Sequence, residues 1–165
     1  EPPQELTRLR SLHRAIGQGV VADTGTAAVL GALSVPEVER ASREGGACVV
    51  NADNSHVIAF LLLHGTIRGI YEHHTGLMDA QSLWRDLELF RSGDLGAEEV
   101  FRNEGHGCCY LEEPEKAGGF GSVYVLGPNR DMLAGYSVTF PAPGGDMMLA
   151  GCFGLLYGLR RLQER

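Results

Sequence analysis

The spacing of apolar residues changes along the chain from a helical period to strand-like runs and back again. Leucines 6, 9 and 12 with Ile16 recur at helical spacing, which predicts a helix that stops at Gly17. Short apolar runs bounded by turn residues follow, and each run predicts a strand. The expected elements, in order, are helices at 6–16 and 24–33, strands at 47–50, 57–63 and 66–72, a helix at 79–93, a helical turn at 98–101, a loop at 103–109, strands at 122–126 and 136–140, and a helix at 146–161.

This order predicts an α/β fold. Three strands joined by tight turns form an antiparallel meander, and the strand-and-crossover segments near the end of the chain add parallel strands. We therefore expect a mixed five-stranded sheet with helices on both faces, a ribonuclease-H-like three-layer lobe. Residues 1–45 are expected to form a helical lead-in segment and residues 46–165 the lobe. Because the chain starts at Glu1 instead of Met, we expect a fragment of a longer protein.

Composition and charge exclude several functions. The chain carries a net charge of −7, and its only lysine is Lys116, so no basic face is available for nucleic acid. The longest apolar run, 147–159, is too short to cross a bilayer and predicts a buried helix. No signal peptide opens the chain, and the spacing of its four cysteines fits no secreted pattern, so we expect a cytoplasmic protein with free thiols.

A polar turn separates the first two predicted strands. It contains Asn51, Asp53, Asn54, Ser55 and His56, whose backbone N–H groups and side chains are of the kind that hold phosphate. The only acid among them is Asp53, which is the expected ligand of a metal ion or of water. The alternative is an ordinary hairpin, in which Asn and Asp only satisfy the turn geometry.

Histidines and a carboxylate gather at the end of the third predicted strand. Glu72, His73 and His74 occupy consecutive positions, and His106 stands between two glycines, as a residue presented to a ligand would. They are candidates for acid–base chemistry or for binding a metal. Strand alternation sends His73 and His74 to opposite faces, so one of them can instead be a buried, hydrogen-bonded core residue.

Two further candidates are weaker. A zinc site could combine the histidines with Cys108 or Cys109, but no pair has the spacing of zinc ligands. The loop that contains Gly127, Asn129 and Arg130 follows a strand end, which is where open α/β sheets bind ligands, and it also fits a simple Pro-Asn turn.

Several segments carry a resemblance to known families. The stretches VADTGTAAVLGAL, VVNADNSHVIAF, GIYEHHTGLMD, NEGHGC, VLGPNR and GGDMMLAGCFGLL resemble a prokaryotic family labelled as pyruvate formate-lyase activating enzymes, from Val20 to the C-terminus. The closing DMMLAGCFGLLYGL is similar to the last helix of sugar kinases. Residues 51–56 resemble the D-x-G-x-x-T phosphate turn of actin-like ATPases, with Asn51, Asp53 and His56 at the acid, glycine and threonine positions.

The resemblance implies a function. The chain would be the nucleotide-binding lobe of an actin-like ATPase or small-molecule kinase, with ATP and Mg²⁺ held against a preceding lobe. Residues 51–56 would face the phosphates, residues 127–130 the base or ribose, and His73, His74 or His106 the metal, water or a small-molecule substrate. Asp53 and Glu72 would bind metal. The oligomeric state is left open.

Two alternatives remain beside this reading. One is a non-catalytic regulatory or assembly module with the same fold, and the other is a metal-dependent hydrolase built on the histidines. Radical chemistry of the activating-enzyme type is not expected, because the chain has no C-x-x-x-C-x-x-C motif to hold an iron–sulfur cluster.

Overall fold

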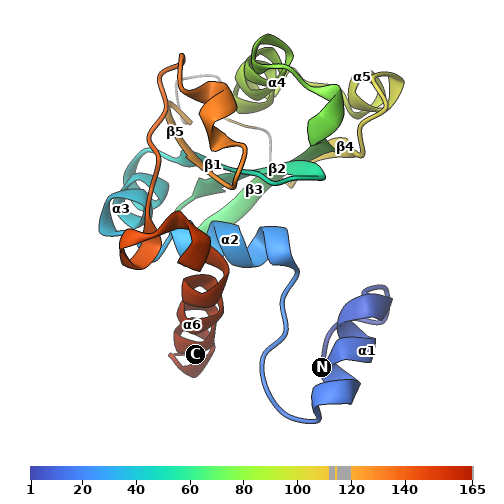
Figure 1. The fold of residues 1–165 in the computed structure, drawn as a ribbon, viewed down its shortest axis with the longest axis vertical. Coiled ribbons are helices and arrows are strands. Elements are labelled where there is room, and N and C mark those ends of the chain that lie inside the picture. Colours follow the sequence, from blue (N-terminus) through green and yellow to red (C-terminus); the bar gives the residue numbers. More distant parts are fainter. Residues whose placement is uncertain (112–113, 115–119, 165) are drawn as a thin grey trace.

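The computed structural model describes residues 1–111, 114 and 120–164. A five-stranded mixed sheet lies between two helical layers, with strand order β4-β3-β2-β1-β5 (Figure 1). The helices are α1 (Thr7–Ile16), α2 (Thr24–Ala32), α3 (Pro36–Glu44), α4 (Ala80–Ser92), α5 (Ala97–Arg102) and α6 (Ala150–Gln163). The strands are β1 (Ala47–Ala52), β2 (His56–Leu63), β3 (Thr66–His74), β4 (Gly107–Tyr110) and β5 (Ser122–Leu126). Single 3-10 turns occupy Thr75–Leu77, Arg130–Leu133, Pro143–Gly145 and Met147–Leu149.

Strand β1, which lies between β2 and β5, contributes to both halves of the apolar core. All of its residues are buried, and alternate side chains point to opposite faces. Cys48 and Val50 join a core covered by α4, whereas Ala47 and Val49 join a core covered by α2 and α3. The expected α/β fold, a mixed sheet with helices on both faces, is confirmed.

Strand directions confirm the antiparallel meander, since β1 pairs with β2 and β2 with β3 in that sense. The sheet has one parallel pair, β1 with β5. The strand expected at 136–140 is wrong as a full strand. Only Thr139 bridges to β5, through two backbone hydrogen bonds of 2.9 Å, because the exposed segment bends at Tyr136 and leads into Pro141.

The expected loop at 103–109 is wrong in its second half. Gly107–Tyr110 forms β4, which pairs with β3 in antiparallel sense at the edge of the sheet. The glycines predicted a loop throughout. Gly107 instead has a φ of +115° and forms the bend at which the chain enters the strand. The fifth strand of the sheet is therefore this segment, not 136–140.

The helices before the sheet differ in their packing. Helix α1 has no buried residue and stands apart from the rest in Figure 1, joined by an extended linker. Helices α2 and α3 contribute Val29, Ala32 and Val38 to the core below the sheet. The boundary between a lead-in segment and a lobe stays a prediction.

Helix α6 is less buried than expected. Only Ala150 and Gly154 are buried along it, and Leu156 and Leu162 are exposed. In the described part of the chain, no helix combines the length and the apolar character that a membrane span needs.

Close backbone contact joins α6 to α2. A Cβ atom at Gly154 would overlap the carbonyl oxygen of Ala27, and one at Gly31 would overlap the carbonyl oxygen of Ala150. Glycine at these positions therefore sets how near the two helices approach.

We expect Gly154→Ala to lower the free energy of unfolding by about 2 kcal/mol or more, because the helices must separate to admit the methyl group. Gly151→Ala is the matched control, since nothing lies within 4 Å of its Cβ position and alanine is favoured in a helix by about 1 kcal/mol. Urea denaturation measures both values. Equal stability of the two variants would contradict the packing described.

Candidate functional site

Strands β1, β3 and β5 finish, and strand β2 begins, at the same end of the sheet, which we call the functional edge. One carbonyl group connects these strand ends. The backbone oxygen of Asp53, in the turn between β1 and β2, accepts a hydrogen bond from Thr75 Oγ1 at 2.7 Å and from Asn129 Nδ2 at 3.0 Å. Thr75 follows β3 and Asn129 follows β5. The two hydrogen bonds to the Asp53 carbonyl therefore fix the β1–β2 turn against the ends of β3 and β5.

The β1–β2 turn and the loop after β5 lie against each other. Gly127 has a φ of +96° and leaves no room for a Cβ beside the Ala52 carbonyl, and the Asn129 N–H donates to that carbonyl at 3.0 Å. The structure thus brings together the two segments that sequence reasoning assigned to a nucleotide. Within the turn, the Asp53 carboxylate accepts the Asn54 N–H at 2.8 Å.

The other predicted residues of these segments vary in exposure. Asn51 is buried within β1, whereas Asn54 and Ser55 are exposed at the tip of the turn. The Nε atom of Arg130 lies 4.0 Å from Oδ1 of Asp131, its neighbour in the chain.

Three histidines meet beside this edge. His56 opens β2 and is the direct partner of His74 at the end of β3. Both point to the sheet face that Ile58 and Ile70 share with α2, because they follow the same alternation. Cross-strand partners on one face are close neighbours.

His106 reaches the pair through the end of α5. That helix ends in a Schellman motif, in which Gly105 N–H donates to Val100 O at 2.9 Å and Glu104 N–H to Phe101 O at 3.0 Å. Glu104 takes a left-handed φ of +63°, a strained conformation for a residue other than glycine. The chain then turns onto β3, where His106 N–H donates to Glu72 O at 3.0 Å.

The resulting triad, His56, His74 and His106, has the composition of a metal site. One ring nitrogen from each lies within 4.8 Å of the others, and the ring centroids are 4.4 to 5.0 Å apart. A zinc-like ion about 2.0 Å from each nitrogen requires about 3.4 Å between them. Because the side chains are partly or fully exposed, small rotations close that difference.

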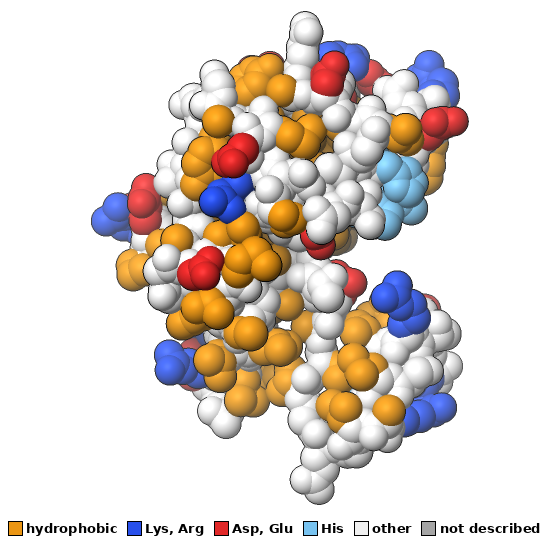
Figure 2. Space-filling model, viewed as in Figure 1, with side chains coloured by type: hydrophobic (Ala, Val, Ile, Leu, Met, Phe, Trp, Pro, Cys, Tyr) orange, Lys and Arg blue, Asp and Glu red, His pale blue; other side chains and the backbone are white. Residues whose placement is uncertain are grey.

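The triad faces open space. In Figure 2 a patch of histidine side chains lies at the rim of a hollow between the sheet layers and α1. A metal ion held by three protein ligands at such a rim keeps a coordination position free for water or substrate.

The pKa of His74 is lowered from its ordinary value. Desolvation is the largest cause, the neighbouring rings of His106, His56 and His73 add to it, and the carboxylate of Glu72 opposes it. A neutral imidazole is the form that binds metal.

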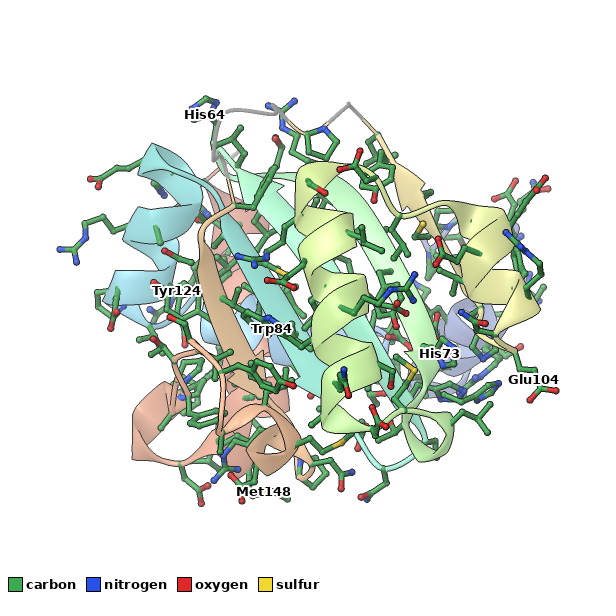
Figure 3. The ribbon with its side chains drawn as sticks, turned by 90° about the horizontal axis from the view of Figure 1, so that it is seen from above. His64, His73, Trp84, Glu104, Tyr124 and Met148 are labelled. Atoms are coloured by element: carbon green, nitrogen blue, oxygen red, sulfur yellow. The ribbon has the colours of Figure 1, made fainter. Side chains whose placement is uncertain are left out.

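His73 is separated from the triad. It points to the opposite face, is 1% exposed and lies beside α4, as Figure 3 shows. Near it, the Tyr71 hydroxyl donates to Asp86 Oδ2 at 3.1 Å, and burial raises the pKa of Asp86. A cavity of about 500 Å³ opens there, lined in part by His73, Arg85 and Asp86.

Sequence reasoning missed Thr75 and Asp86. Asp86 left a signal, since it falls three residues after Leu83 and four before Phe90, within the apolar face of α4. A carboxylate at such a position indicates a buried polar contact. The role of Thr75 depends on its hydroxyl meeting a turn 22 residues earlier, which no local pattern reveals.

Fold and site define an α/β lobe with a histidine cluster at one edge of its sheet. The family model described as "Putative pyruvate format-lyase activating enzyme (DUF1786)" matches residues 1–132, and the chain belongs to that family. A search of curated proteins found no match. The four cysteines of the chain do not form the motif C-x-x-x-C-x-x-C.

The lowered pKa of His74 predicts a pH effect on the metal-free protein. Protonation is harder in the folded state than in the unfolded chain, so this contribution to stability is complete above pH 6.5 and decreases as the pH falls through that value. We expect the melting temperature to fall between pH 7.5 and pH 5.5, and to fall less in His74→Gln. An equal fall in both proteins would show that folding does not lower the pKa of His74.

Proposed function

We propose that the chain is a metal-dependent hydrolytic lobe, in which His56, His74 and His106 bind a divalent ion of the zinc class. The observation that carries the proposal is the convergence of three imidazole nitrogens within 4.8 Å. Three histidines from three segments of chain form a set of neutral nitrogen ligands, which suits zinc and related ions better than magnesium or calcium.

The chemistry follows from the open side of the triad. A zinc-class ion lowers the pKa of its bound water to about 7, which supplies hydroxide at neutral pH. Glu72 lies on the same face of β3 as His74 and is the candidate base for the released proton. An acyl or phosphoryl group entering from the hollow would be the electrophile.

Asp53 has a different part in this proposal. Its carboxylate accepts the N–H of the next residue, and its carbonyl holds Thr75, one residue after His74. It therefore fixes the edge of the sheet instead of binding the metal.

Metal binding tests the proposal directly. We expect the metal-free protein to bind one Zn²⁺ or Co²⁺ ion per chain, with visible Co²⁺ bands of four-coordinate geometry, and to gain metal-dependent hydrolysis of chromogenic esters or phosphates. His56→Ala, His74→Ala and His106→Ala should each weaken binding by about 100-fold, since each removes one of three ligands.

His64→Asn is the matched control. His64 lies in the exposed β2–β3 turn with a φ of +53°, at the opposite end of the sheet from His73 in Figure 3, and asparagine tolerates that conformation. Equal metal affinity in the control and in all three triad variants would overturn the proposal.

A nucleotide-binding lobe is the second candidate, and the sheet order supports it. Strands β3-β2-β1-β5, extended by the parallel bridge at Thr139, follow the layout of ribonuclease-H-like lobes. The β1–β2 turn and the 127–130 loop lie at the edge where such lobes contact ATP and Mg²⁺. Because the side-chain amide of Asn129 already donates to the Asp53 carbonyl and to Asn54 Oδ1, a phosphate would need hydrogen-bond donors other than this amide.

A thermal-shift assay on the protein tests this second candidate. Millimolar Mg-ATP should raise the melting temperature by several degrees if the lobe binds nucleotide, and Asp53→Ala should reduce the shift. No shift in the wild type would contradict nucleotide binding and favour a non-catalytic module or the hydrolytic lobe.

A further inference from the structure

His73 is the only histidine among the described residues that is fully buried, yet half of its ring has no partner. Its Nε2 atom makes no hydrogen bond in the described structure. Burying an unsatisfied imidazole nitrogen costs free energy that an aliphatic side chain of similar size would not. Core packing alone therefore does not explain a histidine at this position.

The other ring nitrogen of His73 contacts the backbone of the triad. Nδ1 lies 3.3 Å from the carbonyl oxygen of His74. Because a carbonyl can only accept a hydrogen bond, the proton belongs on Nδ1, which leaves the unpartnered Nε2 as the bare nitrogen of the neutral ring. His73 thus restrains the peptide group that follows a triad residue.

The ring of His73 also packs against the segment that precedes His106. A Cβ atom at Gly105 would overlap Cδ2 of His73 and would lie 2.9 Å from its Nε2. Gly105 is consequently pressed onto the imidazole, one residue before His106. A single buried ring therefore touches the backbone beside two of the three triad members.

The surroundings hold this ring in place. Tyr71, two residues earlier on the same face of β3, has its ring centroid 6.4 Å from that of His73. The Tyr71 hydroxyl donates to Asp86 of α4, and Asp86 lines the same cavity as His73. The ring of His73 thus lies between its own strand and the cavity beside α4.

We propose that His73 is a positioning residue for the metal site. Its Nδ1–H restrains the His74 carbonyl, and its ring limits how closely Gly105 approaches β3. Together these contacts hold the side chains of His74 and His106 at a spacing that one ion can bridge. This inference rests on the proposed metal function.

Two amide substitutions separate positioning from packing. Asparagine can place an N–H where His73 has Nδ1, whereas glutamine places its amide near the position of Nε2. We expect His73→Asn to weaken Co²⁺ binding by only about threefold, because it keeps an N–H for the His74 carbonyl but loses the ring beside Gly105. His73→Gln should weaken binding by about tenfold and shift the Co²⁺ absorption bands. Melting temperatures of the metal-free variants verify that both fold.

A second pair of variants tests the Gly105 contact without changing His73. Gly105→Ala should weaken Co²⁺ binding and shift its bands, because the methyl group would overlap the His73 imidazole and Cγ1 of Val100, so the segment before His106 must move. Gly76→Ala is the matched control, since nothing lies within 4 Å of its Cβ position.

The outcomes distinguish the two proposals. No Co²⁺ binding by the wild type would overturn the metal function and the role of His73 with it. Normal binding by the wild type, with unchanged affinity and spectra in His73→Gln and Gly105→Ala, would overturn only the positioning role. Equal losses in His73→Asn and His73→Gln would overturn the role of the Nδ1–H group, because both variants lose the ring but only His73→Gln loses the N–H at that position.

Discussion

The hydrogen bonds to the Asp53 carbonyl are the constraint on which the functional edge depends. Thr75 and Asn129 donate to the same oxygen, so the β1–β2 turn, the end of β3 and the loop after β5 cannot move independently. Thr75 N–H also donates to Ser55 O at 2.9 Å. As a result His56, which follows Ser55, and His74, which precedes Thr75, are held opposite each other before any ligand arrives. Such preorganisation is what a binding site needs from its scaffold.

Alternation along β3 separates two kinds of histidine. His74 faces the open side with His56 and His106, where partial exposure allows a metal and its water to enter. His73 faces α4, where it is enclosed with Tyr71 and Asp86. Neighbouring residues of one strand thus place the proposed metal site and the residue proposed to position it on opposite faces of the same sheet. The tight turn at Glu104 and Gly105 links the two, because it packs on His73 and delivers His106.

Most of the layer structure could be predicted from sequence because local signals agreed with the final packing. The helix at Ala80–Ser92 has the predicted caps, with Ser82 N–H donating to Asp79 and Gly93 in the left-handed region. Predictions failed where long-range pairing outweighed local pattern. The segment Gly107–Tyr110 becomes an edge strand because it pairs with β3, and 136–140 stays irregular because only Thr139 bridges to β5. Opposite faces for His73 and His74 follow from alternation, but the approach of His106 depends on the end of α5, which has no sequence signature.

The central claim is that three imidazoles bind one ion, and X-ray absorption at the zinc edge tests it most directly. For protein loaded with one equivalent of Zn²⁺, the account predicts three imidazole nitrogens and one oxygen at about 2.0 Å, with no sulfur. The imidazole signal should fall in His106→Ala, which keeps the His56 and His74 pair. A first shell made of oxygen or sulfur, or a spectrum unchanged in that variant, would contradict the account.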